Sequence, residues 1–210
     1  TPRPKPERRI PGISPQPVFQ VVVVFGLIFL IGALTWTKSI NYLTAGFEAR
    51  DGLDNLSDGE LQAALASLDR AIDLAPDIFV YHNLRAAVHS SYRRQNDLPG
   101  DPDCADSVRG GSYETCVAHQ EYLNNLQAAE QRPLDWRPRL TLAQSALNLG
   151  SLDQNPALID EATRYYLEVA QLDPQTWWHW EWLAAAYIQV GQPEEAFEPL
   201  NQSLSILDGT

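Results

Sequence analysis

The two cysteines, Cys104 and Cys116, are the residues of this 210-residue chain best suited to covalent chemistry. Their spacing matches no short zinc-binding motif, and no paired motif joins them to the four histidines, His82, His89, His119 and His179. No basic or histidine partner is placed to activate either thiol, so a catalytic cysteine is not expected. Two outcomes stay open, a disulfide in an oxidising compartment or a pair of free thiols in a reducing one.

Four aspartates lie in or beside the segment between the cysteines, namely Asp97, Asp101, Asp103 and Asp106. Clustered carboxylates can bind calcium, but the EF-hand spacing and its closing glutamate are absent. The sequence therefore predicts a solvated acidic loop and no metal site. It also holds no nucleophile elbow, phosphate-binding loop, zinc-protease motif or dinucleotide fingerprint, so neither an enzyme activity nor a cofactor is predicted.

Four tryptophans form a dense aromatic stretch around His179, at positions 177, 178, 180 and 182. Neighbouring residues on one helix point about 100° apart, so these rings cannot all face one core. Exposed aromatic side chains often anchor partners, which makes Trp178 a candidate contact. The alternative, weighed equally, is that the tryptophans pack between helices or onto a bilayer surface.

Residues 18–37 carry no charged side chain, and they are enough to cross a hydrocarbon layer of about 30 Å as a helix. This run is too long for a strand and longer than the apolar region of a cleaved signal peptide, so we expect a retained transmembrane helix. Residues 1–17 are rich in proline and hold four basic residues and one acid. Basic flanks stay in the cytoplasm, so residues 38–210 are predicted to lie outside it.

The part of the chain after residue 37 is strongly acidic, with 11 basic and 26 acidic residues. Phosphate binding requires clustered lysine and arginine, so nucleic acid is not an expected partner. The chain contains no methionine and begins at Thr1. We therefore expect either a processed protein or one piece of a longer polypeptide.

Beyond the apolar run, the chain resembles itself at intervals. Gly59 and Gly191 are each followed by a small residue five positions later and a large apolar residue four further on, and a third copy contains Ala162 and Tyr166. A second motif, Trp180-x2-Leu183-Ala184-x2-Tyr187, has a looser copy beginning at Tyr81. Together these patterns resemble the tetratricopeptide repeat, a unit of two antiparallel helices.

This resemblance implies a right-handed α-solenoid, so that together with the apolar run we expect an all-α fold in which one transmembrane helix is followed by the solenoid. The four expected units span about 45–77, 78–135, 136–176 and 177–210, with a loop insertion at 93–116 in the second unit. Tetratricopeptide arrays usually bind a peptide or a partner helix in a concave groove lined by first helices. On this sequence the groove-facing positions would be His82, His89, Arg137, Gln144, Trp178 and Glu181.

Two functions follow from the topology and the resemblance. The first is a membrane-tethered protein-interaction scaffold outside the cytoplasm, where a Cys104–Cys116 disulfide is favoured. The alternative is the non-catalytic C-terminal region of a multi-span enzyme, because the apolar span and the repeats are similar to the end of bacterial O-antigen ligase or polymerase-like proteins. That resemblance implies a bacterial cytoplasmic membrane and an enzyme that transfers lipid-linked glycans.

Overall fold

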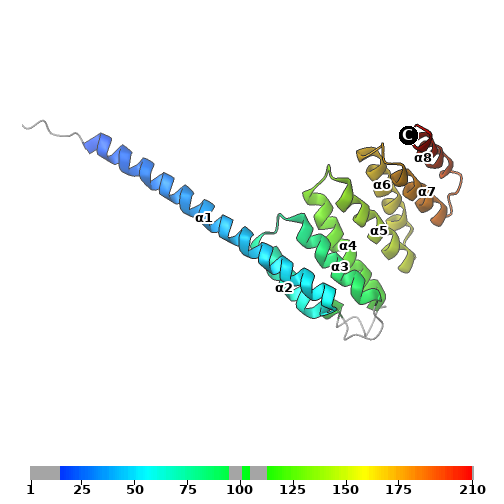
Figure 1. Cartoon of the computed structure of the whole chain (residues 1–210), viewed down its shortest axis with the longest axis horizontal. Coiled ribbons are helices and arrows are strands. Elements are labelled where there is room, and N and C mark those ends of the chain that lie inside the picture. Colours follow the sequence, from blue (N-terminus) through cyan, green and yellow to red (C-terminus); the bar gives the residue numbers. More distant parts are fainter. Residues whose placement is uncertain (1–14, 95–100, 105–112, 210) are drawn as a thin grey trace, which may run out of the picture. The chain divides into compact units, whose positions relative to one another are not determined.

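The computed structural model describes residues 15–94, 101–104 and 113–209, and over these residues the protein is all-α (Figure 1). The predicted cytoplasmic segment, apart from residues 15–17, lies outside the described residues, as do Asp97 and Asp106. The helices are α1 (Pro15–Asp58), α2 (Leu61–Leu74), α3 (Phe79–Arg94), α4 (Tyr113–Gln131), α5 (Trp136–Leu152), α6 (Pro156–Leu172), α7 (Trp177–Gln189) and α8 (Phe197–Asp208).

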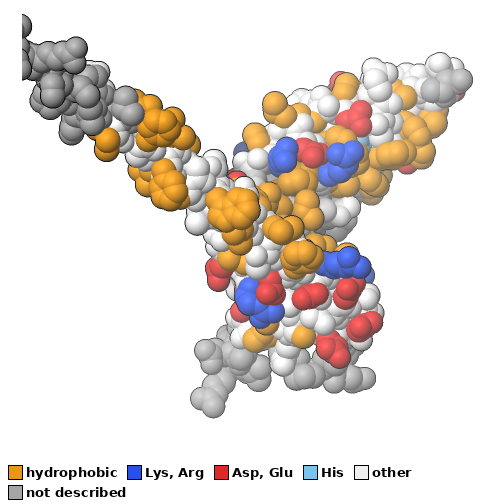
Figure 2. All heavy atoms as spheres, turned by 60° about the vertical axis from the view of Figure 1, so that its left-hand side comes forward, with side chains coloured by type: hydrophobic (Ala, Val, Ile, Leu, Met, Phe, Trp, Pro, Cys, Tyr) orange, Lys and Arg blue, Asp and Glu red, His pale blue; other side chains and the backbone are white. Residues whose placement is uncertain are grey.

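Helix α1 runs through two compact units of the chain, Thr1–Tyr42 and Leu43–Thr210. Its described portion Val22–Asp58 is long and apolar enough to cross a membrane, and the most apolar stretch has no buried residue. Hydrophobic side chains cover much of this stretch in Figure 2. The hydroxyl groups of Thr35 and Thr37 donate hydrogen bonds to backbone carbonyls one turn earlier, so these polar groups are satisfied within the helix itself.

In the second unit, the end of α1 packs antiparallel against α2. Glu48 accepts a 2.8 Å hydrogen bond from Arg70, and one turn further along, Gly52 lies against Leu68. A Cβ atom on Gly52 would lie 2.8 Å from Leu68 Cγ, which explains why a glycine allows these helices to approach so closely. Gly59 then adopts a φ of +80°, a left-handed conformation that glycine accepts, and the chain reverses into α2.

The remaining helices stack in order, and each packs on the next (Figure 1). Small and large apolar residues alternate in the core of α4–α7, because small residues let two helix backbones approach while large ones fill the space beside them. Ala162, Tyr166 and Val169 of α6 lie in this core, as the sequence periodicity predicts. The last helix, α8, leaves an apolar stripe exposed, at Phe197, Leu200, Leu204 and Leu207.

Candidate functional site

A hollow of about 190 Å³ lies between two first helices, α3 and α5, and is closed on one side by α4. Most of its lining residues are polar, and α3 supplies more than half of the lining residues at helical spacing. The lining residues are Asn83, Ala86, Ala87, Ser90 and Arg94 of α3, Glu121 and Asn125 of α4, and Thr141 and Gln144 of α5. Because α3 and α5 also contact each other directly, the hollow lies on the face that first helices share.

The electrostatics of this hollow centre on Glu121, which is largely buried. Burial raises the pKa of the Glu121 carboxyl, and the guanidinium groups of Arg93 and Arg94 oppose this by favouring the ionised form. Arg93 Nη2 lies 3.3 Å from Glu121 Oε2, so the carboxylate is paired on one side. Asn125 donates its side-chain N–H to the carbonyl of Thr141 at 3.3 Å, which ties α4 to α5 across the hollow. The arrangement offers amides and both signs of charge, which suits a peptide.

Of the six residues predicted to line a groove, Gln144 lies on the wall of this hollow. Arg137, Trp178 and Glu181 are exposed on α5 and α7, but they are not among its lining residues. His82 and His89 must be corrected, because both are buried: His82 keeps 8% of its surface exposed and His89 none, so they offer a partner little or no surface. Nε2 of the His82 ring instead lies 3.2 Å from the carbonyl oxygen of Pro76, and the His89 ring contacts Asp101 of the insertion.

The correction at α3 is a matter of helical register. Asn83 and Ser90 line the hollow, and each follows one of the mispredicted histidines by one position, which on a helix is a rotation of about 100°. The loose motif copy that begins at Tyr81 predicts a helix over this segment, but it does not indicate which side of that helix faces solvent. The spacing of Asn83, Ala87, Ser90 and Arg94, small or polar residues along one face, was the signal available in the sequence.

The described part of the insertion is bound to α3 through a buried polar network. Asp101 is fully buried, which corrects the prediction of a solvated acidic loop at this position. Its Oδ2 lies 2.5 Å from His89 Nδ1, its Oδ1 accepts from the Asp103 N–H at 2.9 Å, and its own N–H donates to the Tyr113 hydroxyl at 2.7 Å. These bonds satisfy the buried carboxylate, whose desolvation would otherwise be costly.

Arg85 joins this network to the preceding helix. Its guanidinium group donates to Asp69 of α2 and to Asp103 of the insertion, each at 2.7 Å, and Nη1 lies 3.1 Å from His89 Nε2. Burial tends to lower the pKa of Arg85, but the two carboxylates outweigh this and raise it. Donor atoms of His89, Asp101 and Asp103 lie within 4.8 Å of one another, a spacing that a metal ion could use. The guanidinium group already occupies this position with a positive charge, so we interpret the cluster as an ion-pair network.

Cys104 and Cys116 form a disulfide, with their Cα atoms 5.9 Å apart. Cys116 lies in the first turns of α4, whereas Cys104 ends the short turn at 102–104 that follows Asp101. The insertion is therefore joined covalently to α4 and by hydrogen bonds to α3. Both thiols are consumed, so neither one serves as a nucleophile in this state.

The tryptophan stretch of α7 surrounds His179, which is fully buried. Its ring centroid lies 4.5 Å from that of Trp136 of α5 and 5.6 Å from that of Trp182. Trp180 donates its indole N–H to the carbonyl of Pro174 at 3.0 Å. Trp178 is the member with the most exposed side chain among the four, at 41%. Trp178 therefore faces solvent, whereas the other three tryptophans of the stretch are partly buried.

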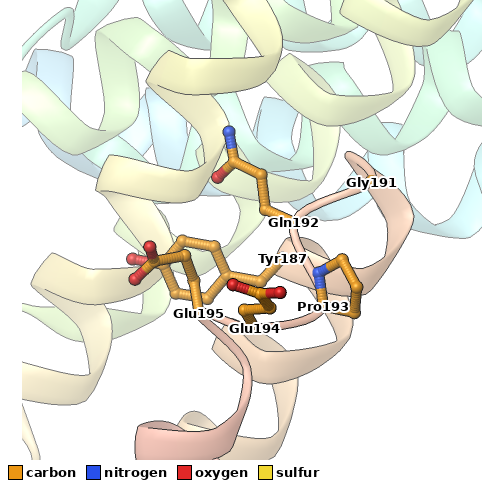
Figure 3. Close-up of a pocket in the computed structure, with 6 residues that line it drawn as sticks. All are labelled: Tyr187, Gly191, Gln192, Pro193, Glu194 and Glu195. Atoms are coloured by element: carbon orange, nitrogen blue, oxygen red, sulfur yellow. The ribbon is translucent and has the colours of Figure 1, made fainter.

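A second hollow, of about 590 Å³, lies at the turn between α7 and α8 (Figure 3). Tyr187 of α7 lines it together with Glu194 and Glu195, and Gly191, with φ +77°, lies in the turn that carries these two glutamates. Burial raises the pKa of the Tyr187 hydroxyl, and the charges of Glu195 and Glu198 raise it further. This hollow is acidic and open, and it holds none of the six predicted groove residues.

Comparison with known proteins identifies the fold. No protein-family model matches the chain, and no curated protein sequence matches it. Solved structures do match. One called "MamA AMB-1" superposes with a TM-score of 0.56 at 17% identity, covering 79% of this chain and 80% of the other. A second, MamA from residue 41 of Desulfovibrio magneticus RS-1, has a TM-score of 0.56 at 13% identity, covering 79% and 77%. A third, called "MamA MSR-1", gives 0.55 at 17% identity, covering 78% and 77%.

At these identities the likeness concerns the fold alone. It agrees with the all-α prediction and with the helix pairs described above. The chain is an all-α solenoid of tetratricopeptide-like helix pairs, with one long apolar helix at its N-terminal end.

Proposed function

We propose that the protein is a membrane-tethered scaffold whose solenoid binds a protein partner outside the cytoplasm. The observation that carries this proposal is the hollow between α3 and α5, which lies on the first-helix face and presents amides, a paired carboxylate and a guanidinium group. Such groups can bind the backbone and charged side chains of a peptide.

The tether is the apolar portion of α1. Its length and composition satisfy the requirements of a spanning helix, and its hydroxyl groups are bonded to its own backbone. The basic residues before it support an N-terminus in the cytoplasm. The Cys104–Cys116 disulfide supports an oxidising environment for the solenoid.

Site-specific photo-crosslinking tests the groove. A photoreactive residue replaces Gln144, on the wall of the hollow, and in a matched variant replaces Gln171, which is exposed on the second helix α6. In native membranes we expect a discrete adduct from position 144 and none from position 171. Equal adducts from both positions, or none from 144, would contradict the groove.

Thiol labelling tests the topology. An impermeant maleimide applied to intact cells should label Cys104 and Cys116 only after an impermeant reductant opens the disulfide. Labelling that requires lysis would place the solenoid on the cytoplasmic side.

The alternative, a C-terminal region of a multi-span glycan-transferring enzyme, shares this tether and this solenoid. The two proposals differ in what precedes Thr1 in the gene. A long multi-span region upstream would support the enzyme, whereas a start codon within a few residues would support the scaffold.

A further inference from the structure

The last helix of the solenoid, α8, carries an apolar stripe that no other described helix covers. The stripe consists of residues spaced by three and four positions, namely Phe197, Leu200, Leu204 and Leu207. Their exposed fractions are 67%, 37%, 56% and 41%. Among the described helices, α8 packs extensively on α7 alone, at one end of the stack (Figure 1). We call these four residues the α8 stripe.

The corresponding positions of α2 show what such a stripe does inside the solenoid. Counted from Gly59 as the α8 stripe is counted from Gly191, they are Leu65, Leu68, Ile72 and Ala75. Three of them are buried, and Ile72 is half-buried. Helix α2 packs against the first helix α3 that follows it, whereas no helix follows α8 among the described residues. The α8 stripe therefore has the pattern of an internal second helix, and a helix is the shape that fits it.

The end of the chain that carries the stripe is acidic. Residues 165–210 contain no lysine or arginine, and their acids are Glu168, Asp173, Glu181, Glu194, Glu195, Glu198 and Asp208. The last four of these are exposed, two in the turn before α8 and two on α8 itself. Glu198 directly follows the first residue of the stripe, and Asp208 directly follows the last. A carboxylate therefore lies beside each end of the stripe.

Charge complementarity indicates which helix can cover this stripe. Lysine and arginine beside the seam of a bound helix would pair with these carboxylates, whereas acids there would be repelled. A second copy is disfavoured, because another α8 brings the same acids. Residues 43–58 of α1, the first helix at the other end of the solenoid, carry one arginine against several acids, namely Glu48, Asp51, Asp54 and Asp58. An anionic lipid surface is repelled for the same reason.

The open hollow at the α7–α8 turn adds a place for a basic side chain (Figure 3). Tyr187, Glu194 and Glu195 line it, and the chain continues from there directly into α8. A lysine ammonium or an arginine guanidinium group can pair with carboxylates and lie over an aromatic ring. A basic residue of a bound helix that extends past Phe197 would therefore find suitable partners in this hollow.

We propose that the α8 stripe is a docking surface for an amphipathic helix of a partner protein, whose apolar seam is flanked by lysine and arginine. Leu200 and Leu204, at the centre of the stripe, contact the seam, and the carboxylates at both ends of α8 pair with the basic residues. This surface is separate from the hollow between α3 and α5, so the inference does not depend on that site.

Two designed peptides test this chemistry on the full chain in phosphatidylcholine nanodiscs. Each peptide has about three heptads with leucine at positions a and d, and the two differ only in lysine or glutamate at the positions beside that seam. The anisotropy of a dye on the peptide measures binding, with empty nanodiscs as the blank. We expect the lysine peptide to bind and the glutamate peptide to bind about tenfold more weakly or not at all.

Variants of exposed residues assign the contact. Leu204→Asp should weaken binding of the lysine peptide about tenfold. Glu198→Lys should weaken it severalfold and should strengthen binding of the glutamate peptide. Leu134→Asp is the matched control, because Leu134 is an exposed apolar residue of the α4–α5 turn, and it should leave binding unchanged. Far-ultraviolet circular dichroism checks that every variant keeps its helices.

A variant of the other hollow separates the two surfaces. Gln144→Lys, on the wall of the hollow between α3 and α5, should leave binding of the lysine peptide unchanged. Loss of binding in this variant but not in Leu204→Asp would place the peptide in that hollow and overturn the proposal. Equal binding of the two peptides would also overturn it.

Sedimentation of the detergent-solubilised chain without peptide examines the remaining occupant, a second copy. We expect the same sedimentation for the wild-type chain and for Leu204→Asp over a range of protein concentrations. Self-association that Leu204→Asp abolishes would show that a second copy covers the stripe, and the partner helix would then be ruled out as its occupant.

Discussion

His89 Nδ1 lies 2.5 Å from Asp101 Oδ2, and neither side chain has measurable exposure to solvent. This pair joins the centre of a solenoid helix to a segment that composition alone marks as a loop. A buried carboxylate is stable when several N–H or O–H groups donate to it. Removing any one partner leaves a buried polar group without its hydrogen bond, which lowers the free energy of unfolding. The insertion is thus part of the fold, and its removal would affect α3.

Replacing Asp101 tests this directly. Asp101→Ala leaves the His89 ring N–H and the Asp103 N–H without their acceptor, so we expect the free energy of unfolding to fall by about 2–3 kcal/mol. Urea denaturation of the detergent-solubilised chain measures the loss. Asp51→Ala, at an exposed position of α1, should change stability by less than about 0.5 kcal/mol. Equal effects at the two positions would contradict a structural role for the buried pair.

The disulfide should act on the same segment from its other side. Replacing Cys104 and Cys116 together by serine opens a short ring, so we expect a loss of about 2–3 kcal/mol in denaturant unfolding. Combined with Asp101→Ala, the loss should be smaller than the sum of the separate losses, because both changes release one segment. Strict additivity would show that the two attachments act independently.

Two glycines of α1 should respond in opposite directions to the same substitution. Gly52→Ala places a Cβ atom 2.8 Å from Leu68 Cγ, so we expect α1 and α2 to separate at a cost of about 1–3 kcal/mol. Gly46→Ala meets no atom within 4 Å in an exposed helical position, so it should stabilise the protein by about 0.5–1 kcal/mol. Thermal unfolding followed by circular dichroism compares the two variants, and a shared sign would contradict the packing described here.

His82 should make stability depend on pH. Burial lowers the pKa of its ring below the ordinary value of 6.5, and the charge of Arg85 lowers it further, whereas the hydrogen bond to Pro76 opposes them. The unfolded chain therefore takes up a proton at higher pH than the folded chain. The neutral His82 ring makes its full contribution to the free energy of unfolding above about pH 6.5. This contribution declines as the pH falls from there toward the pKa of the ring in the folded chain.

The measurement is urea unfolding between pH 5 and 8, with His82→Gln as the comparison. The variant should show a shallower decline below pH 6.5. At pH 8, where the ring is neutral in both states, the remaining difference between the two proteins reports packing and hydrogen bonding alone. An unchanged slope in the variant would remove His82 as the cause.

The sequence was most informative where a residue's surroundings are local. The all-α fold follows from the 3.6-residue period, and the left-handed turns at Gly59 and Gly191 follow from the glycines that mark them. Asp101 could not be placed in this way, because its partner His89 is twelve residues earlier and the intervening composition is that of a loop. Long-range pairing of this kind carries no periodic signal.

The groove-facing residues stay a prediction, and the structure shows only how they lie relative to the hollow. Gln144 lies on its wall, on the helix α5, whose clear apolar face sets the helical register. On α3, buried polar residues obscure that face, so the motif put His82 and His89 where Asn83 and Ser90 lie. Glu121 was missed because it belongs to a second helix, outside the positions that a first-helix motif can indicate.

The bond between Cys104 and Cys116 also changes what a cut in the backbone would do. These residues are twelve positions apart, so any single cleavage between them leaves both fragments covalently joined. Such a nicked chain would keep its full mass and would separate into two pieces only in the presence of a reductant. Both backbone cleavage and reduction of the disulfide would therefore be needed to separate the two parts of the solenoid that this bond joins.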